Sequence, residues 1–129
     1  MLNNTGITQT KYNDITQILI DPSNYFAMGI VVDETCGTAD STTGKKIAKA
    51  GTPVTGSLDA RTTAFTPANA DGSDAVGILL HDVDLTRGDN NGAILLFGFV
   101  NTNRIDATTK AKINAAVQTK LNKITFVAC

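Results

Sequence analysis

The sequence predicts a β-rich α+β protein, and three features carry that prediction. The first is residues 75–81, a continuous apolar run that indicates a strand buried on both faces. The second is the turn signal at residues 89–92, followed by another apolar run over residues 93–100; we expect the two runs to pair as a hairpin. The third is an amphipathic helix over residues 108–121, near the C-terminus.

Composition limits both the core and the partners. The chain has 129 residues, of which 42% are hydrophobic and 5% aromatic, with no tryptophan. This length fits one compact domain, whose core must be built from small aliphatic side chains. A net charge of -1 and a pI near 5.6 leave no broad basic field. We therefore expect no binding to nucleic acid or to an anionic membrane.

The first 24 residues differ from the rest of the chain. Residues 1–24 are polar and rich in Asn, Thr and Gln, so we interpret them as an N-terminal arm preceding a β-rich domain at 25–129. The arm contains one apolar cluster, formed by Ile15, Ile18, Leu19 and Ile20. Two interpretations are open: the cluster is a first strand of the fold, or it is a segment that becomes ordered on a partner.

Short strands separated by turns follow the arm. The β-branched run at residues 28–32 predicts a strand, and a Gly, Thr, Ser and Asp loop follows at 36–44. Further strands are expected at 45–48 and 52–58. A polar stretch with an Asp-Gly turn at 71–72 then leads to the strongest strand.

The C-terminal segment combines the helix with a last strand. Asp106 is a suitable N-cap, and Ile113, Val117 and Leu121 recur at four-residue spacing on one helix face. Residues 124–127 are apolar enough to close the chain as a strand. We therefore expect a single short helix to cover one end of the sheet.

The two cysteines give no covalent framework. Cys36 and Cys129 provide neither a disulfide network nor a CxxC metal site. The N-terminus lacks the basic and apolar regions of an export signal, so we expect reduced thiols and a protein made in the cytoplasm. No apolar run approaches the ~20 residues that a membrane-spanning helix needs.

The sequence contains no convincing pattern for a catalytic or a metal-binding site. His81 is followed by Asp82 and Asp84, but a triad also needs an activated nucleophile, and Cys36 is an unsupported candidate. Asp82, Asp84 and Asp89 suggest calcium, yet the segment breaks the EF-hand pattern because Arg87 stands where an oxygen ligand belongs. The Gly-Lys pair at 44–45 fails the phosphate-loop pattern. We expect solvated turn carboxylates, no metal, no cofactor and no enzyme.

The order of the parts is more distinctive than any single motif. Residues 50–54 read Ala-Gly-Thr-Pro-Val, an Asp-Gly turn follows at 71–72, and residues 75–79 read Ala-Val-Gly-Ile-Leu. A hairpin strand at 93–100, a Lys, Thr and Ala-rich helix and a final apolar strand complete the series. Over residues 49–127 this series resembles the phage head-decoration family of the lambda type, the capsid-stabilising proteins.

The resemblance implies a fold and a role. It implies a β-clip-like small barrel of short strands with one amphipathic helix near the C-terminus. It also implies a homotrimer at the threefold sites of an expanded icosahedral capsid, where the trimer clamps neighbouring capsid proteins and performs no catalysis. The protein is then expected in the virion, on the outer capsid surface, as a late structural component.

Two sets of residues are the predicted contacts. We expect Ile15, Ile18, Leu19 and Ile20 to bind the major capsid protein by adding a strand to its exposed edges. Phe97 and Phe99 are the predicted trimer interface, because alternate residues of one strand cannot all face a small core. The alternative function is another β-rich phage module, such as a tail or head-completion component, and a small hydrolase is a more distant one.

Overall fold

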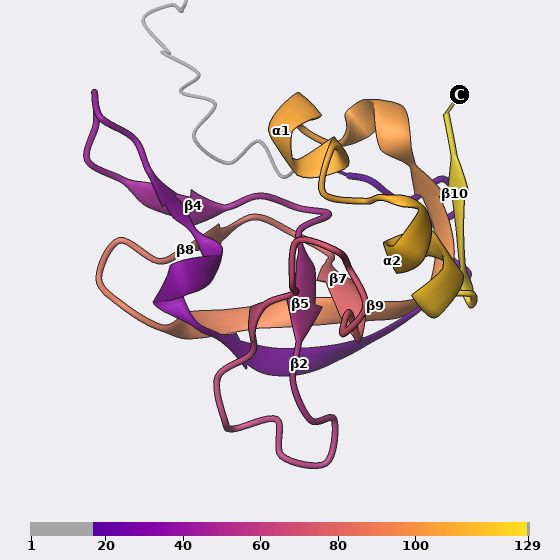
Figure 1. The fold of residues 1–129 in the computed structure, drawn as a ribbon, viewed down its shortest axis with the longest axis horizontal. Coiled ribbons are helices and arrows are strands. Elements are labelled where there is room, and N and C mark those ends of the chain that lie inside the picture. Colours follow the sequence, from indigo (N-terminus) through magenta and orange to yellow (C-terminus); the bar gives the residue numbers. More distant parts are fainter. Residues whose placement is uncertain (1–16, 129) are drawn as a thin grey trace, which may run out of the picture.

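The computed structural model describes residues 17–128 (Figure 1). In chain order it contains β2 (Phe26–Val32), the 3-10 helix η1 (Glu34–Cys36), β3 (Thr38–Ala39), β4 (Lys46–Ala48), β5 (Pro53–Thr55), β6 (Thr66–Pro67), β7 (Gly77–Leu79), β8 (Val83–Asp84), β9 (Asn90–Asn101), the 3-10 helix η2 (Thr102–Arg104), α1 (Ala107–Lys110), α2 (Ala115–Lys120) and β10 (Ile124–Val127). The β-rich α+β class is confirmed.

Two sheets share the described chain. The larger has six strands in the order β10-β9-β7-β5-β6, with β2 paired to β9 as well. Its pairs are antiparallel except β10 with β9, which is parallel. The smaller sheet has the order β3-β4-β8. Figure 1 shows the long strands β2 and β9 lying side by side, with β4 and β8 near one end and α2 and β10 near the other.

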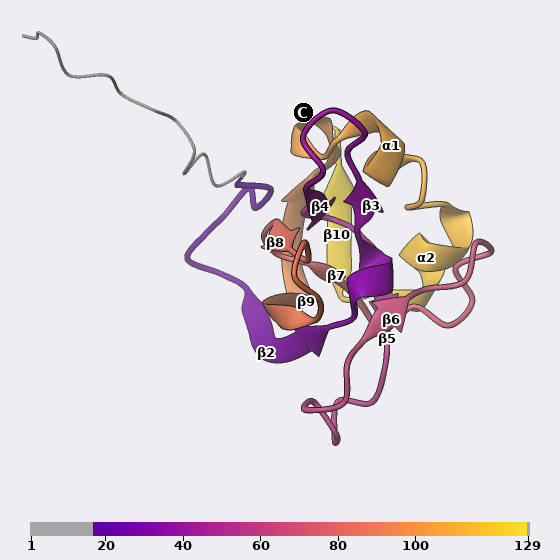
Figure 2. The ribbon, with the colours of Figure 1, turned by 90° about the vertical axis from the view of Figure 1, so that its left-hand side faces the viewer.

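The expected barrel is not formed. In the larger sheet the end strands β6 and β10 pair with β5 and β9 respectively and not with each other, so the sheet stays open. Closing a barrel requires that pairing, because closure is what removes the sheet edges. Figure 2 shows the loop between β5 and β6 extending away from the body.

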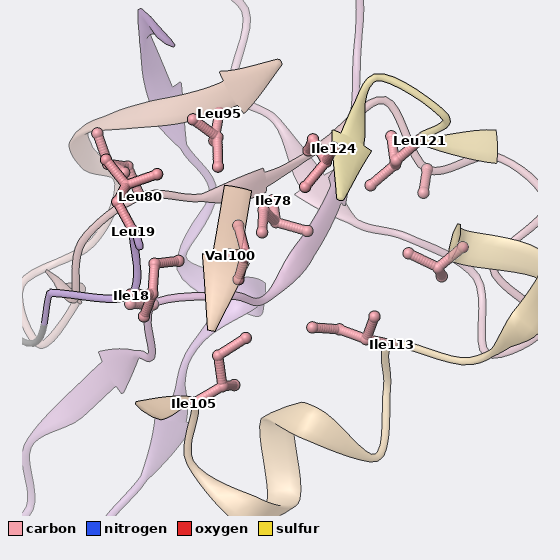
Figure 3. Packing of buried hydrophobic residues seen from close by; sticks show 13 residues of the cluster. Ile18, Leu19, Ile78, Leu80, Leu95, Val100, Ile105, Ile113, Leu121 and Ile124 are labelled. Carbon is pink, nitrogen blue, oxygen red and sulfur yellow. The ribbon is translucent and has the colours of Figure 1, made fainter. Parts of the chain in front are cut away.

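The core consists of two apolar clusters, one on each side of β7. Ile78 and Leu80 belong to the first cluster, whereas Leu79 belongs to the second. Figure 3 shows the first cluster, in which Ile78, Leu95, Val100 and Ile124 from three strands lie near Ile113 and Leu121 of the C-terminal segment. The expectation that residues 75–81 supply a strand buried on both faces is confirmed at β7. Its predicted hairpin partner is confirmed as well, since Ile78 lies opposite Leu95.

The predicted reversal at residues 89–92 is displaced. Asn90 already begins β9, and the chain turns earlier, where the Gly88 N–H donates to the Leu85 carbonyl at 3.1 Å. Gly88 has φ +117°, which glycine adopts without the steric cost that other residues have. Gly88 therefore provides the backbone freedom that the sequence analysis assigned to the Asn-Asn-Gly segment.

The single predicted helix over 108–121 is two helices. Asp106 caps α1 as expected, by accepting a hydrogen bond from the Thr108 N–H at 3.2 Å. Asn114 then adopts an extended backbone, with φ -88° and ψ -177°, and its side chain caps α2 by accepting from the Val117 N–H at 3.0 Å. Asparagine is a strong N-cap and a poor interior helix residue, which is why the helix restarts there.

We expect Asn114→Ala to lower the free energy of unfolding by about 1–2 kcal/mol. The variant loses the cap of α2, and the Ala70 carbonyl loses the Asn114 side-chain amide that donates to it at 3.1 Å. Thermal or urea unfolding measures the change. Asn122→Ala removes an exposed asparagine just beyond α2 and should cost less than about 0.5 kcal/mol. Equal losses in both variants would contradict the capping role.

The start of the described chain belongs to the core. Ile18 is 0% exposed and Leu19 is 4% exposed, and both lie in the first apolar cluster. Leu19 forms an antiparallel bridge with Val100, flanked by hydrogen bonds from Ile20 N–H to Phe99 and from Asn101 N–H to Ile18. Of the two interpretations left open, residues 18–20 are nearer the first: they are part of the fold, although Leu19 makes an isolated β-bridge and not a full strand.

This burial corrects the predicted capsid-binding set. Ile18 and Leu19 already fill the core of their own domain, so their side chains are not available to a partner. Ile20 is 45% exposed and remains accessible. Ile15 and the rest of residues 1–16 lie outside the described residues. Within the predicted arm, Ile18 and Leu19 pack with the core of the domain at 25–129.

Candidate functional site

The exposed large hydrophobic side chains of the described chain gather at one end of β9. They are Ile20, Tyr25, Phe26, Phe97 and Val127, with exposed fractions of 45%, 43%, 54%, 39% and 38%. Each belongs to β9 itself or to a segment that lies along β9 residues 97–101. A concentration of this kind on a small protein is typical of an interaction surface.

The strand register places most of these side chains on one face. Phe26 lies opposite Phe97 in the β2–β9 pair, and Phe99 lies two residues further along β9. Residues two apart on a strand, and residues directly opposite each other, point to the same side of a sheet. Phe26, Phe97 and Phe99 therefore share one face.

Two aliphatic residues extend this face on either side of β9. Ile20 is aligned with Phe99, since the Ile20 N–H donates to the Phe99 carbonyl at 2.9 Å. Val127 lies opposite Asn101, which is two residues beyond Phe99. We call the set Ile20, Phe26, Phe97, Phe99 and Val127 the apolar face. Lys120 and Lys123 lie beside it, since they line one hollow together with Phe26 and Phe97.

The apolar face is uncovered because the core layers end partway along β9. In the first half of the strand, Ile94 packs into one cluster and Leu95 into the other, so both faces are buried. In the second half, Val100 faces the first cluster. No apolar cluster formed by the described residues covers the opposite side there, where Phe97 and Phe99 lie.

A β-bulge sets the direction of Phe97. Phe26 pairs with Phe97 and Ala27 pairs with Leu95, so Leu96 is an extra residue on β9. Bulges of this kind redirect side chains near sheet ends. Phe97 and Phe99 then contact each other edge to face, with ring centroids 6.5 Å apart. This geometry is favourable for aromatic pairs and fixes both rings at the surface.

The predicted trimer residues thus lie together and reach the surface, while their use in a trimer stays a prediction. Strand alternation predicts Phe97 and Phe99 from the sequence, but it does not indicate that Phe26, Ile20 and Val127 lie on the same face. Alternation within one strand identifies its own outward residues. The neighbours on other strands depend on the register, and the register contains a bulge.

The candidate catalytic residues are not brought together into a reactive site. His81 is exposed at the end of β7, whereas Cys36 is 6% exposed. The Cys36 thiol donates to the Phe65 carbonyl, with 3.4 Å between Sγ and O. Burial raises the pKa of Cys36 to about 11, so the reactive thiolate is scarce at neutral pH.

We expect Cys36 to resist thiol reagents in the native protein at pH 8 and to react once the chain is unfolded. A Cys129→Ser variant isolates the Cys36 signal, which is followed with a chromogenic disulfide reagent before and after addition of urea. The burial and the pKa of about 11 are the physical reasons. Native-state labelling at the rate of a small free thiol would contradict them.

The aspartates suspected as calcium ligands bind backbone groups instead. Asp82 accepts the Ala50 N–H at 2.7 Å, and Asp89 accepts the Glu34 N–H at 2.9 Å. Asp84 accepts both the N–H of Thr86, at 3.0 Å, and its hydroxyl, two residues along the turn. Within residues 17–128, no group of three His, Cys, Asp or Glu side chains is placed to hold a metal ion.

Acidification is expected to destabilise the fold. The pKa of Asp33, Asp40 and Asp71 is lowered chiefly by hydrogen bonds from backbone N–H groups, and that of Asp84 chiefly by the Thr86 hydroxyl. A carboxylate whose folded pKa is lowered contributes stability above its unfolded pKa of about 3.9, and that stability is lost as pH falls through the folded value. The melting temperature should therefore drop below about pH 4. A constant value down to about pH 2 would contradict this.

Comparison with known proteins adds no family assignment. No protein-family model matches the chain, and no curated protein matches it. No helix among the described residues is long and apolar enough to cross a bilayer.

Proposed function

We propose that the protein is a virion structural protein that binds as a homotrimer to the outer surface of an expanded icosahedral phage capsid, at threefold sites, and stabilises it. The observation that carries this proposal is the apolar face. A monomer of this size seldom leaves so many large apolar side chains exposed on one sheet end unless a partner covers them.

The trimer interface in this proposal is the apolar face with Phe97 and Phe99 near its middle. Large aromatic side chains dominate the binding energy of protein interfaces. Three copies packed around a threefold axis would remove all three apolar faces from water together. The series of elements at residues 49–127 supports the same assembly through its resemblance to the decoration family.

Capsid contact in this proposal comes from residues 1–16, which include Ile15, whereas Ile20 belongs to the apolar face that the trimer covers. The buried bridge of Leu19 with Val100 would anchor each arm to its domain immediately before the surface begins. A trimer would then present three arms at once. Such multivalency can raise overall binding by a factor of about 10² or more, provided that the capsid sites match the arm spacing.

Two measurements on the purified full chain test the proposal. Sedimentation velocity over a dilution series should show a trimer at micromolar concentration without any capsid. Co-sedimentation should then show saturable binding to expanded, undecorated capsids and little binding to unexpanded ones, which serve as the matched control. A stable monomer, or no capsid binding, would contradict the proposal. A ring of another size bound at a capsid vertex or tail would favour a head-completion or tail component.

A further inference from the structure

A second hollow, of about 530 Å³, lies between the smaller sheet and the segment around α1. One wall comes from the hairpin of β3 and β4, and the other comes from α1 and Lys112. Figure 2 shows this hairpin on the same side of the molecule as α1. No residue of the apolar face lines this hollow, so it is separate from the surface proposed for the trimer. We call it the Thr109 pocket, and its volume is that of pockets that bind small molecules.

The Thr109 hydroxyl has no hydrogen-bond partner from residues 17–128. Thr109 is 4% exposed and lines the pocket. Its carbonyl accepts the Lys112 N–H at 2.9 Å, but its hydroxyl takes part in no hydrogen bond with a described residue. A buried hydroxyl without a partner is unfavourable, and native structures contain few of them. In a pocket, such a group is suited to a bound ligand.

Thr52 shows the usual arrangement in the same pocket. It is 3% exposed and also lines the pocket, but its hydroxyl donates to the Lys49 carbonyl at 2.6 Å. The two threonines are therefore similarly buried and differ in whether the hydroxyl is bonded within the chain. This difference identifies Thr109 as the buried polar group that remains available to a ligand.

Three lysines line the Thr109 pocket. They are Lys45, Lys49 and Lys112, and all three are exposed. Within the described chain, none of their ammonium groups forms an ion pair or a hydrogen bond. An ammonium group offers three donors and no acceptor, and charged acceptors bind it most strongly. The lysines therefore favour a ligand that carries an anionic group.

Two carboxylates line the pocket beside these lysines. The Asp40 carboxylate accepts the Thr42 N–H at 2.8 Å, and the Asp106 carboxylate accepts the Thr108 N–H at 3.2 Å. Three positive and two negative side chains leave the lining with one positive charge in excess. The remaining carboxylate oxygens need donors, and ligand hydroxyls donate without adding positive charge. An anion that also bears hydroxyls therefore matches the lining better than a bare anion.

The lining also limits the body of the ligand. Among the described residues that form it, none is aromatic, so a nucleobase would find no ring to stack on. Its apolar residues are small or aliphatic, namely Cys36, Ala39 and Ile47. They can pack against a short carbon chain or against the less polar face of a sugar ring.

We propose that the Thr109 pocket binds a small hydroxylated organic anion, of the class of sugar phosphates and sugar acids. The phosphate or carboxylate group of the ligand lies among the three lysines. One ligand hydroxyl bonds the Thr109 hydroxyl, and others donate to Asp40 and Asp106. This site does not depend on the capsid function proposed above.

Titration calorimetry of the full chain with glucose 6-phosphate and, separately, with glucuronate tests the ligand class. The better of the two should bind saturably with a Kd below about 1 mM, and the comparison shows whether phosphate or carboxylate is preferred. Glucose lacks the charge and inorganic phosphate lacks the hydroxylated carbon chain, so each should bind at least about tenfold more weakly. No saturable binding of either acid, or equal binding of glucose or of inorganic phosphate, would overturn the proposal.

Amide NMR spectra locate the binding site. On addition of the better probe, the signals of Thr43, Thr109 and Lys112 should shift, because all three residues line the pocket. The signals of Phe97 and Phe99 should not change, since these residues lie on the apolar face. Shifts confined to the apolar face would overturn the assignment to the Thr109 pocket.

A pair of threonine variants separates ligand binding from folding. Thr109→Val loses no hydrogen bond within the described chain, so its melting temperature without ligand should stay within about 2 °C of the unmodified chain or rise. Its affinity for the better probe should fall at least about fivefold. Thr52→Val is the matched control, since it loses the bond to the Lys49 carbonyl and should melt at a lower temperature. Unchanged probe affinity in Thr109→Val would overturn the proposal.

A pair of lysine variants tests the role of charge in the pocket. Lys112→Gln removes a positive charge from the lining and should weaken binding of the better probe at least about threefold. Lys110→Gln makes the same change two residues earlier, on an exposed lysine that does not line the pocket, and should weaken binding less than about twofold. Equal losses in the two variants would overturn the proposal, because the probe would then respond only to overall charge.

Discussion

Replacing Phe65 with alanine is expected to lower the free energy of unfolding by about 3–5 kcal/mol. Phe65 is 0% exposed and is the largest of the fully buried side chains in the described chain. Its backbone also joins β2 to the loop that precedes β6, since its N–H donates to Val31 and its carbonyl accepts from Asp33. The truncation leaves a cavity in the second core cluster, which small aliphatic neighbours cannot fill.

Urea unfolding monitored by circular dichroism measures this loss. Phe26→Ala is the matched control, because it removes the same atoms from a side chain that is 54% exposed. The control should cost less than about 1 kcal/mol in the isolated protein. If the two variants lost equal stability, Phe65 would not be the main support of the second cluster.

Phe97→Asp is expected to have the largest effect on assembly. An aspartate at this position would bring an unpaired charge into the centre of the proposed interface, where desolvation penalises it. The loss should reach at least about 2 kcal/mol of association free energy, which is roughly a thirtyfold weaker trimer. Sedimentation velocity over a dilution series measures the change.

Ala39→Asp serves as the control for Phe97→Asp. Ala39 is exposed on β3, in the smaller sheet, so it introduces the same charge away from the apolar face. Its trimer should sediment as the unmodified chain does. An unaltered trimer in Phe97→Asp would mean that the subunits meet through another surface.

Local sequence signals located most of the strands. The last strand matches residues 124–127, and the pairing of β7 with β9 follows the predicted hairpin. These elements were predictable because their apolar runs are long relative to their turns. Burial on both faces of β7 also follows from its lack of alternation, since Ile78 and Leu79 enter different clusters.

Features that depend on distant partners were not predictable. Nothing local indicates that Leu19 meets Val100, although Ile18 and Leu19 both belong to the core. The break in the C-terminal helix had a local signal, because Asn114 is a good N-cap, but the regular spacing of Ile113, Val117 and Leu121 concealed it. The open sheet depends on which strands end at its edges, which is a property of topology and not of any one segment.

The apolar face also has one part that local sequence predicts and one part that depends on distant partners. Strand alternation was sufficient to identify Phe97 and Phe99, because it is a property of one strand. Phe26 joins them through a register that shifts at Leu96, and Val127 joins them through a parallel pairing near the C-terminus. Identifying all the residues of the apolar face therefore required the three-dimensional arrangement of the strands.

A density map of expanded capsids incubated with this protein tests the central claim most directly. The account predicts additional density at the threefold sites, with three copies meeting through Phe97 and Phe99 and with their N-terminal segments reaching the capsid surface. Capsids without added density, or copies that meet through a surface remote from these two residues, would contradict it.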